Sequence, residues 1–342
     1  MVRCQNEAVA RIEVQSVPMA VKAPFRAGVR PPFLVLISAQ NRPDCRRGFE
    51  SVQIFSASCH KLPESVELID SSELRQRAMA QMNPFEQQKP IPGIKNIVAV
   101  SSGKGGVGKS TVAVNLAAAL AKRGLKVGLL DADIYGPSLP RMSGTLNTKL
   151  EIGDDKMLVP IRRWGVQLAS IGHLIDEDLA VVWRGPMLFK AMDQFLREVK
   201  WGELDYLLVD LPPGTGDIQL SLAQKVPLKG AIAVSTPQDI SLTDVKKAID
   251  MWARVQVPVL GVIENMAWFV PPGQTERIQL FPKGSLETWL KSNGIAKIGE
   301  VAFNPGIGLS AEAGIPMVQS DPTSEEAQSF DAICGRLIEL TT

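Results

Sequence analysis

Eight consecutive residues form a glycine-rich motif that can bind phosphate. The stretch from Gly103 to Ser110 reads GKGGVGKS and satisfies the pattern G-x-x-x-x-G-K-[ST]. In that pattern the glycines let successive backbone N–H groups converge on phosphate oxygens, and Lys109 neutralises phosphate charge. The hydroxyl of Ser110 can ligate Mg²⁺. The residues expected to contact a nucleotide are Gly103, Gly105, Gly106, Val107, Gly108, Lys109, Ser110 and Thr111.

The sequence on either side of this motif places it at a strand-to-helix turn. Residues 96–100 (NIVAV) are a short apolar run with β-branched side chains, and residues 111–122 have the alanine content and periodicity of a helix. A helix that begins at the glycines presents its positive N-terminal end to bound phosphate. A glycine-rich turn without a ligand is the alternative, and the complete motif in this context argues against it.

Acidic residues follow two other apolar runs. Asp131 and Asp133 come after the run at 126–130, and Asp210 ends the run at 206–209. A carboxylate at the end of a strand beside the phosphate-binding loop can hold Mg²⁺, directly or through water, and we assign that role to Asp210. Asp133 lies on a loop that can sense the terminal phosphate and orient an attacking water. For Asp131 two roles are equally well supported: it can belong to the nucleotide site, or it can cap its own turn.

From residue 95 onward the chain alternates short apolar runs with amphipathic, helix-length stretches. Further strands are expected at 231–234 and 257–263, and helices at 111–122, 189–199, 243–255 and 325–340. Runs that are apolar on both faces are typical of a parallel sheet covered by helices. The pattern predicts one doubly wound α/β domain with a mostly parallel sheet, whose ligand lies at the carboxyl ends of the strands.

Residues 1–88 do not follow this pattern. Up to position 43 they include six basic and two acidic residues, and five prolines interrupt any long helix. Such a segment fits either an organelle-targeting sequence or a disordered extension. A helix is expected at 64–81, and the prolines and glycine of 90–93 mark a boundary. We therefore expect a largely irregular N-terminal extension at 1–88 and a P-loop ATPase domain at 89–342.

Composition and charge exclude several classes of protein. The chain is 45% apolar and 21% charged with a net charge of +1, so its overall charge favours neither nucleic acid nor an anionic membrane as a partner. No apolar run approaches the ~18 residues of a membrane-spanning helix. The cysteines form no CxxC pair, and the two histidines are expected to be surface or packing residues, so the sequence supports neither a disulfide framework nor a zinc site. These residues are Cys4, Cys45, Cys59, Cys334, His60 and His173.

Several segments together resemble one family. From about Gln88 to its end, roughly three quarters of its length, the chain is similar to the Mrp/nucleotide-binding-protein group of the MinD/ParA-type (SIMIBI) P-loop ATPases. The similarity is strongest to the mitochondrial nucleotide-binding-protein-like branch. The segments that carry it are 101–111, 131–140 (DADIYGPSLP), 182–187 (VWRGPM), 201–220, 235–239 (STPQD) and 262–266 (VIENM).

The resemblance implies a slow, Mg-dependent ATP hydrolase that works as a dimer with its nucleotides between the subunits. It implies that Lys104 acts on the partner subunit's phosphates, that Asp133 positions water, that Asp210 is the Walker B residue and that Asn265 contacts the adenine. Members of this family carry iron–sulfur clusters to acceptor proteins, in mitochondria notably toward respiratory complex I. A mitochondrial location is therefore expected, with the cytoplasm or a plastid as alternatives.

The chain departs from the family at the residues that hold its cargo. In the family a CxxC pair follows the ENM segment and bridges a [4Fe–4S] cluster across the dimer, whereas here Pro271 and Gln274 occupy those positions. Neither side chain can be a thiolate ligand. Three interpretations stay open: other residues hold the cluster, a CxxC-bearing relative supplies the ligands in a heterodimer, or the protein is a cluster-free ATPase. Cys334 shares helical spacing with Phe330 and Leu337, which predicts a core position.

Two other functions use the same loop. A MinD-like or ParA-like positioning ATPase needs a basic membrane-sensing helix or a basic DNA-binding surface, but residues 323–342 contain four acidic residues and one arginine. A nucleotide-binding scaffold without chemistry is disfavoured because Lys109, Asp133 and Asp210 are all present. The segment Trp183–Met187 has no role that its chemistry defines, and a buried turn is expected there.

Overall fold

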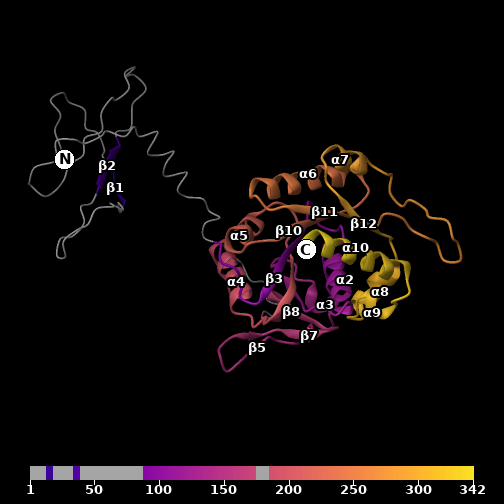
Figure 1. Ribbon diagram of the computed structural model, residues 1–342, viewed down its shortest axis with the longest axis horizontal. Coiled ribbons are helices and arrows are strands. Elements are labelled where there is room, and N and C mark those ends of the chain that lie inside the picture. The colour runs from indigo at the N-terminus through magenta and orange to yellow at the C-terminus, as the bar shows by residue number, and fades with distance from the viewer. Residues whose placement is uncertain (1–12, 18–33, 39–87, 175–184) are drawn as a thin grey trace, which may run out of the picture. The chain divides into compact units, whose positions relative to one another are not determined.

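The computed structural model describes residues 13–17, 34–38, 88–174 and 185–342 (Figure 1). The chain divides into two units, Met1–Arg77 and Ala78–Thr342. In the first unit β1 (Glu13–Val17) pairs antiparallel with β2 (Leu34–Ser38). The helix expected at 64–81, the three cysteines before residue 88, His60, Trp183 and Arg184 lie outside the described residues. The expected turn at Trp183–Met187 is wrong for Gly185–Met187, which form the first residues of the helix α4 (Gly185–Arg197).

An eight-stranded sheet forms the centre of the second unit (Figure 1). Its strand order is β12-β11-β10-β3-β9-β4-β8-β7, and every neighbouring pair is parallel except β7 and β8 at one edge. The strands are β3 (Ile94–Ser102), β4 (Val127–Asp131), β7 (Ile161–Arg163), β8 (Val166–Ser170), β9 (Leu204–Asp210), β10 (Gly230–Ser235), β11 (Val259–Asn265) and β12 (Lys297–Val301). A separate hairpin joins β5 (Glu151–Ile152) to β6 (Leu158–Val159). The predicted mostly parallel, doubly wound sheet is confirmed.

Helices cover both faces of this sheet, because its central strands are buried on both sides. One face packs against α2 (Lys109–Lys122), α3 (Leu139–Met142), α8 (Pro305–Glu312), α9 (Met317–Ser320) and α10 (Glu325–Thr341). The other packs against α4 (Gly185–Arg197), α5 (Asp217–Lys225), α6 (Asp239–Arg254) and α7 (Leu286–Ser292). A short 3-10 helix, η1 (Ile171–His173), follows β8. Among the described helices, none combines the length and apolar character needed to cross a bilayer.

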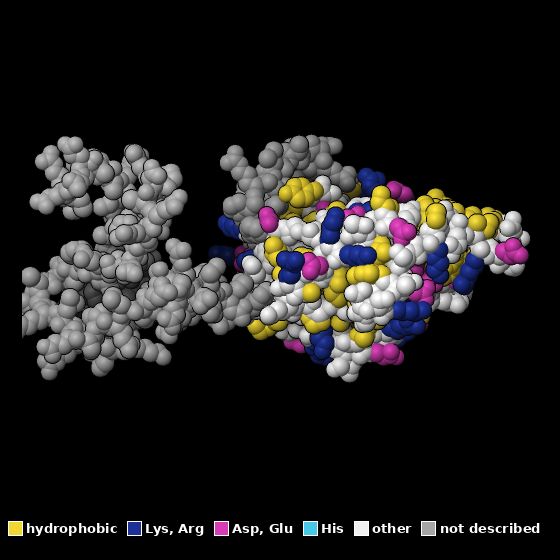
Figure 2. Space-filling model, turned by 90° about the horizontal axis from the view of Figure 1, so that it is seen from above, with side chains coloured by type: hydrophobic (Ala, Val, Ile, Leu, Met, Phe, Trp, Pro, Cys, Tyr) yellow, Lys and Arg dark blue, Asp and Glu magenta, His cyan; other side chains and the backbone are white. Residues whose placement is uncertain are grey.

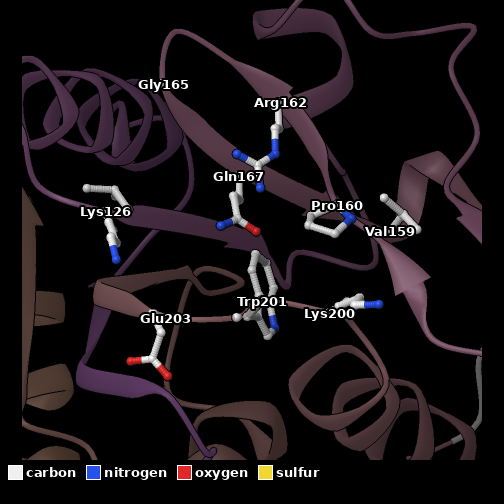
Figure 3. A pocket seen from close by; sticks show the side chains of 11 residues that line it. Lys126, Val159, Pro160, Arg162, Gly165, Gln167, Lys200, Trp201 and Glu203 are labelled. Atoms are coloured by element: carbon white, nitrogen blue, oxygen red, sulfur yellow. The ribbon is translucent and has the colours of Figure 1, made fainter. Parts of the chain in front are cut away.

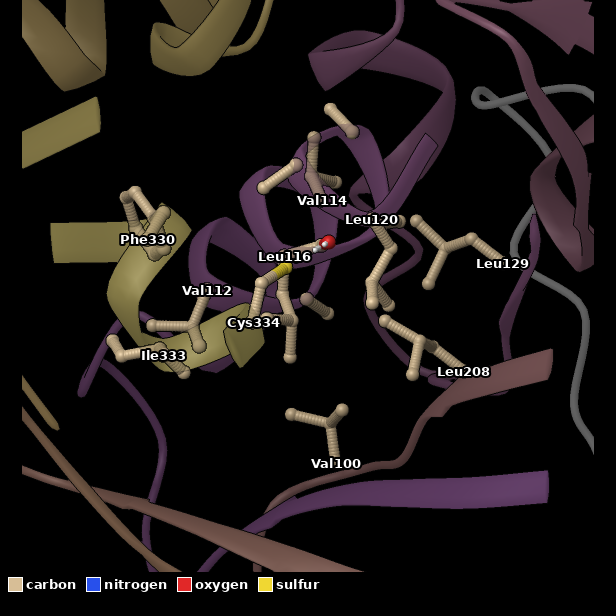
Figure 4. Packing of buried hydrophobic residues seen from close by; sticks show 14 of the residues in the cluster. Val100, Val112, Val114, Leu116, Leu120, Leu129, Leu208, Phe330, Ile333 and Cys334 are labelled. Carbon is tan, nitrogen blue, oxygen red and sulfur yellow. Dashed lines mark hydrogen bonds between the residues drawn. The ribbon is translucent and has the colours of Figure 1, made fainter. Parts of the chain in front are cut away.

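The core between α2 and α10 contains the last cysteine. Figure 4 shows Cys334 packed beside Leu116 and Ile333, and its Sγ lies 3.6 Å from the carbonyl oxygen of Leu116. Burial raises the pKa of the Cys334 thiol to about 12, so the thiol stays protonated at neutral pH. The predicted core position of this residue is confirmed.

Candidate nucleotide-binding site

The glycine-rich motif lies between β3 and α2, at the carboxyl end of the sheet. Gly106 and Gly108 have φ values of 78° and 80°, in the left-handed region that favours glycine. A Cβ placed on Gly106 would meet no atom within 4 Å, so this part of the loop borders open space. The N–H groups in the first turn of α2 have no carbonyl partner within the helix and can therefore bind phosphate.

Lys109 and Asp210 form a buried ion pair at the start of α2. The Nζ atom of Lys109 lies 2.5 Å from Oδ1 of Asp210 and 3.2 Å from Oγ of Ser110. The two charged side chains are only 7% and 4% exposed. The pair forms because β3 and β9 are neighbours in the sheet, with Val100 opposite Asp210. The structure thus brings together the residues predicted to bind phosphate and Mg²⁺.

Asp131 anchors the loop that carries Asp133. Its carboxylate accepts hydrogen bonds from the N–H groups of Asp133 (3.0 Å) and Leu139 (3.1 Å) and from the hydroxyl of Ser170 (3.0 Å). Burial, and next the charge of Asp210, raise the pKa of Asp131 to about 7, while the backbone hydrogen bonds act in the opposite direction. Asp131 therefore caps its own turn, one of the two roles that the sequence left open.

Asp133 follows β4 and is half-buried. Burial raises the pKa of this carboxyl above its ordinary value, and the charge of Lys109 opposes that rise. The N–H of Ala132 donates to the carbonyl of Asp210 at 2.8 Å, so the loop that carries Asp133 begins beside the Lys109–Asp210 pair. A carboxylate with a raised pKa is a better acceptor for a proton from water, which supports its predicted role.

Asn265, predicted from the resemblance to contact adenine, also supports the phosphate-binding loop. Its Nδ2 donates a hydrogen bond to the carbonyl of Val107 at 2.9 Å. A Cβ on Gly108 would lie 2.2 Å from that nitrogen, so this contact requires glycine there. The Oδ1 atom can still accept a hydrogen bond from a base amino group, and the adenine contact stays a prediction.

Lys104 is half-buried, and no acidic side chain in the described part of the chain pairs with it.

The segment that replaces the CxxC pair forms a tight turn. The N–H of Gln274 donates to the carbonyl of Pro271 at 3.0 Å, and Gly273 has a φ of 77°, as a type II turn requires. Nearby, the guanidinium of Arg277 lies over the ring of Trp268 at 4.1 Å from its centroid. In the described ranges, no group of three or more His, Cys, Asp or Glu side chains could hold a metal ion. Pro271 and Gln274 offer no thiolate, so this turn does not fit an iron–sulfur cluster.

Charged side chains of both signs are mixed on the described part of one face of the molecule. On the face of the molecule in Figure 2, Lys and Arg side chains are scattered among hydrophobic and acidic ones. A nucleic-acid-binding face would gather them into a continuous basic patch.

His173 is a buried packing residue, and its titration gives a test. It is 0% exposed, and its Nε2 lies 2.9 Å from Oγ1 of Thr145. Burial lowers the pKa of His173 to about 4, whereas the unfolded side chain titrates near 6.5. Between these values only the unfolded chain takes up the proton, so stability is complete above about pH 6.5 and falls as the pH drops toward 4.

We expect this histidine to lower the free energy of unfolding by up to about 3 kcal/mol over that range. In urea denaturation at pH 4 to 7, His173→Gln should show a smaller loss of stability than the wild type. His60→Gln serves as the matched control and should behave like the wild type. Identical pH profiles for the wild type and His173→Gln would contradict the assignment.

Comparison with known proteins identifies the family. Residues 93–338 match the family model described as the NUBPL iron-transfer P-loop NTPase, of the ParA group. The chain belongs to this family. The resemblance found in its sequence motifs is therefore confirmed.

Relatives in this family share most of their length with the chain. An iron–sulfur cluster carrier protein of Aquifex aeolicus is 48% identical over 258 residues, which cover 75% of this chain and 71% of that protein. The iron–sulfur protein required for NADH dehydrogenase, mitochondrial, of Arabidopsis thaliana is 44% identical over 250 residues, covering 73% and 80%.

Solved structures show the same P-loop fold. The nucleotide-binding protein from Archaeoglobus fulgidus, in complex with ADP, matches with a TM-score of 0.60 and 38% identity, covering 70% of this chain and 93% of that one. The cell division ATPase MinD of Pyrococcus furiosus matches with a TM-score of 0.54 and 23% identity, covering 72% and 99%, and shares the fold.

Proposed function

We propose that this protein is a Mg-ATP-dependent ATPase that acts in iron–sulfur cluster assembly or transfer. The observation that carries the nucleotide part is the buried Lys109–Asp210 pair beside Ser110 at the start of α2. The Archaeoglobus fulgidus relative, whose structure contains ADP, supports a nucleotide ligand. The relatives named as iron–sulfur cluster carriers support the cargo, and the Arabidopsis relative supports a mitochondrial location.

The residues at the site fit Mg-ATP, and each has a distinct task. Ser110 and Asp210 would hold Mg²⁺, which neutralises charge on the β- and γ-phosphates when it is bound. Lys109 and Asp210 neutralise each other in this structure, so both would exchange this partner for the nucleotide and the ion. Asp133 would accept a hydrogen bond from the attacking water and hold it in line with the terminal phosphate. Asp131 keeps the loop of Asp133 in place.

The cargo needs a different account, because Pro271 and Gln274 stand where the family has cysteines. We propose that a CxxC-bearing relative supplies the thiolates in a heterodimer, and that the chain then acts on iron–sulfur acceptor proteins. The same two residues favour a second candidate, a cluster-free homodimeric ATPase with a regulatory or positioning role. Anaerobic reconstitution, with and without such a relative, distinguishes the two candidates.

Lys104 provides a test of the dimer. If it acts on nucleotide in the partner subunit, Lys104→Ala should lower the rate of ATP hydrolysis by about 100-fold and change nucleotide affinity little. The measurements are phosphate release over a range of protein concentrations and titration with a fluorescent ATP analogue. Lys122→Ala, at the exposed end of α2, is the control and should match the wild type. A rate for Lys104→Ala equal to that of the wild type would contradict this role of Lys104.

A further inference from the structure

A cavity of about 480 Å³ lies at the end of the sheet opposite the phosphate-binding loop (Figure 3). Its lining includes Lys126, Gly165 and Glu203, which precede β4, β8 and β9, whereas the phosphate-binding loop follows β3. The cavity is therefore separate from the nucleotide site. Its volume is within the range of small-molecule binding sites, about 300–1,000 Å³.

Arg162 and Gln167, on two neighbouring strands, contribute to one wall of this cavity. Arg162 on β7 pairs with Gln167 on β8, and Gln167 pairs with Gly128 on β4, so the three positions share one face of the sheet. A Cβ on Gly128 would lie 2.7 Å from Leu204, 3.0 Å from Leu207 and 3.1 Å from the ring of Trp201, so these three side chains take the space that a side chain at Gly128 would fill. In Figure 3 the side chain of Arg162 extends toward Gln167, and the amide of Gln167 points toward the ring of Trp201.

Polar groups in this cavity lack partners. The Oε1 atom of Gln167 is buried and has no hydrogen-bond partner, although a buried acceptor normally has one. Within the described ranges, no acidic side chain forms an ion pair with Arg162 or with the ammonium of Lys126, whose backbone N–H donates to Asp205 at 2.9 Å. Lys200, by contrast, pairs with Asp155 at 2.6 Å. Two cationic groups and one buried acceptor are therefore available to a ligand.

We propose that this cavity binds a carboxylate that has a neighbouring N–H or O–H donor and an apolar group. The guanidinium of Arg162 matches the planar geometry of a carboxylate, and Lys126 adds a second positive charge. The N–H or O–H group would donate to Oε1 of Gln167, and the apolar group would pack on the exposed side chain of Val159, with the buried ring of Trp201 behind the cavity wall. A single carboxylate fits better than a phosphate dianion, because Glu203 adds a negative charge to the same lining.

Binding can be measured by NMR through a single resonance of Trp201, which lines the cavity. N-acetyl-leucine, which has all three groups, is titrated into the ¹⁵N-labelled full chain while the indole N–H resonance of Trp201 is recorded. That N–H donates to the carbonyl of Phe195 at 3.1 Å, which protects it from exchange, and Trp201→Phe assigns it. We expect a saturable shift with N-acetyl-leucine and none with N-acetyl-leucinamide, which has no carboxylate.

Variants connect this shift to the proposed contacts. Arg162→Gln should weaken binding at least about tenfold, because it removes a charge-assisted hydrogen bond. Lys229→Gln is the matched control: it removes one positive charge from an exposed position before β10 and should leave the affinity unchanged. Gln167→Leu should weaken binding by a similar factor and, without probe, keep or raise the melting temperature, because it removes an unpaired buried acceptor. If Gln167 had only a structural role, Gln167→Leu would lower the melting temperature.

The same chemistry occurs in small acylated amino acids and at the C-terminus of a polypeptide. Acetyl-Ala-Ala-Leu with a free carboxylate distinguishes these sources, because tighter binding than N-acetyl-leucine indicates a polypeptide end and weaker binding indicates a small molecule. The proposal is overturned if no probe shifts the Trp201 resonance at about 10 mM, far above a 1 mM dissociation constant. It is also overturned if Arg162→Gln and Lys229→Gln bind the probes equally well.

Discussion

Replacing Lys109 with alanine is expected to lower the rate of ATP hydrolysis by about 1,000-fold or more. The ammonium group of Lys109 lies 2.5 Å from Oδ1 of Asp210 and next to the hydroxyl of Ser110, where the phosphates and Mg²⁺ would meet. Its removal takes away the positive charge that balances the charge developing on the transferred phosphate. Phosphate release by the full-length wild type and the variant in Mg-ATP measures the effect.

The same substitution leaves Asp210 buried without its partner, which costs about 3–5 kcal/mol of stability. A loss of activity could then come from unfolding alone. The double variant Lys109→Ala/Asp210→Asn removes both charges, so it should recover much of the stability and still fail to hydrolyse ATP. If Lys109→Ala hydrolysed ATP at the wild-type rate, the enzyme proposal would be refuted. If the stable, folded double variant hydrolysed ATP, Lys109 would serve stability only.

The strands that enclose the nucleotide site could be predicted because they are buried on both faces. The apolar runs at 96–100, 206–209 and 231–234 lie inside β3, β9 and β10. The motif itself fixes Lys109 and Ser110, because a strand-to-helix turn with these glycines has few other uses. Local sequence was sufficient wherever burial or backbone conformation left little choice of residue.

The sheet edges could not be predicted in the same way. β7 has three residues and β8 has Gln167 in its second position, so neither forms an apolar run. Ser170, which ends β8 and binds Asp131, was missed for that reason. Ser170 could have been found only by first predicting a strand that ends directly before η1.

Contacts between distant segments were also beyond the sequence. Asn265 reaches Val107 across 158 positions, through the order of β3, β10 and β11 in the sheet. The role of Asp131 was undecided because it depends on Leu139 and Ser170, which lie 8 and 39 residues away. Such roles follow from strand order and register, which no local pattern specifies.

The isolated protein is expected to bind no stable iron–sulfur cluster, and Pro271→Cys/Gln274→Cys is expected to bind one. Thiolates are the usual cluster ligands, and the thiol of Cys334 is buried with a pKa of about 12. The turn at 271–274 already brings the two positions together, with 3.0 Å between the N–H nitrogen of Gln274 and the carbonyl oxygen of Pro271. Visible charge-transfer absorbance and iron content after anaerobic reconstitution measure the gain.

Position, and not merely the presence of two thiols, should decide this result. Asp154→Cys/Met157→Cys places the same CxxC spacing between β5 and β6, away from the family's position, and should give no stable cluster. A cluster on the wild type that survives Cys334→Ser would show that other residues ligate it, which would contradict the heterodimer proposal. If the wild type gains a cluster only with a CxxC-bearing relative, the heterodimer is supported. If the wild type gains no cluster even with this relative, the heterodimer is contradicted and the cluster-free ATPase is supported.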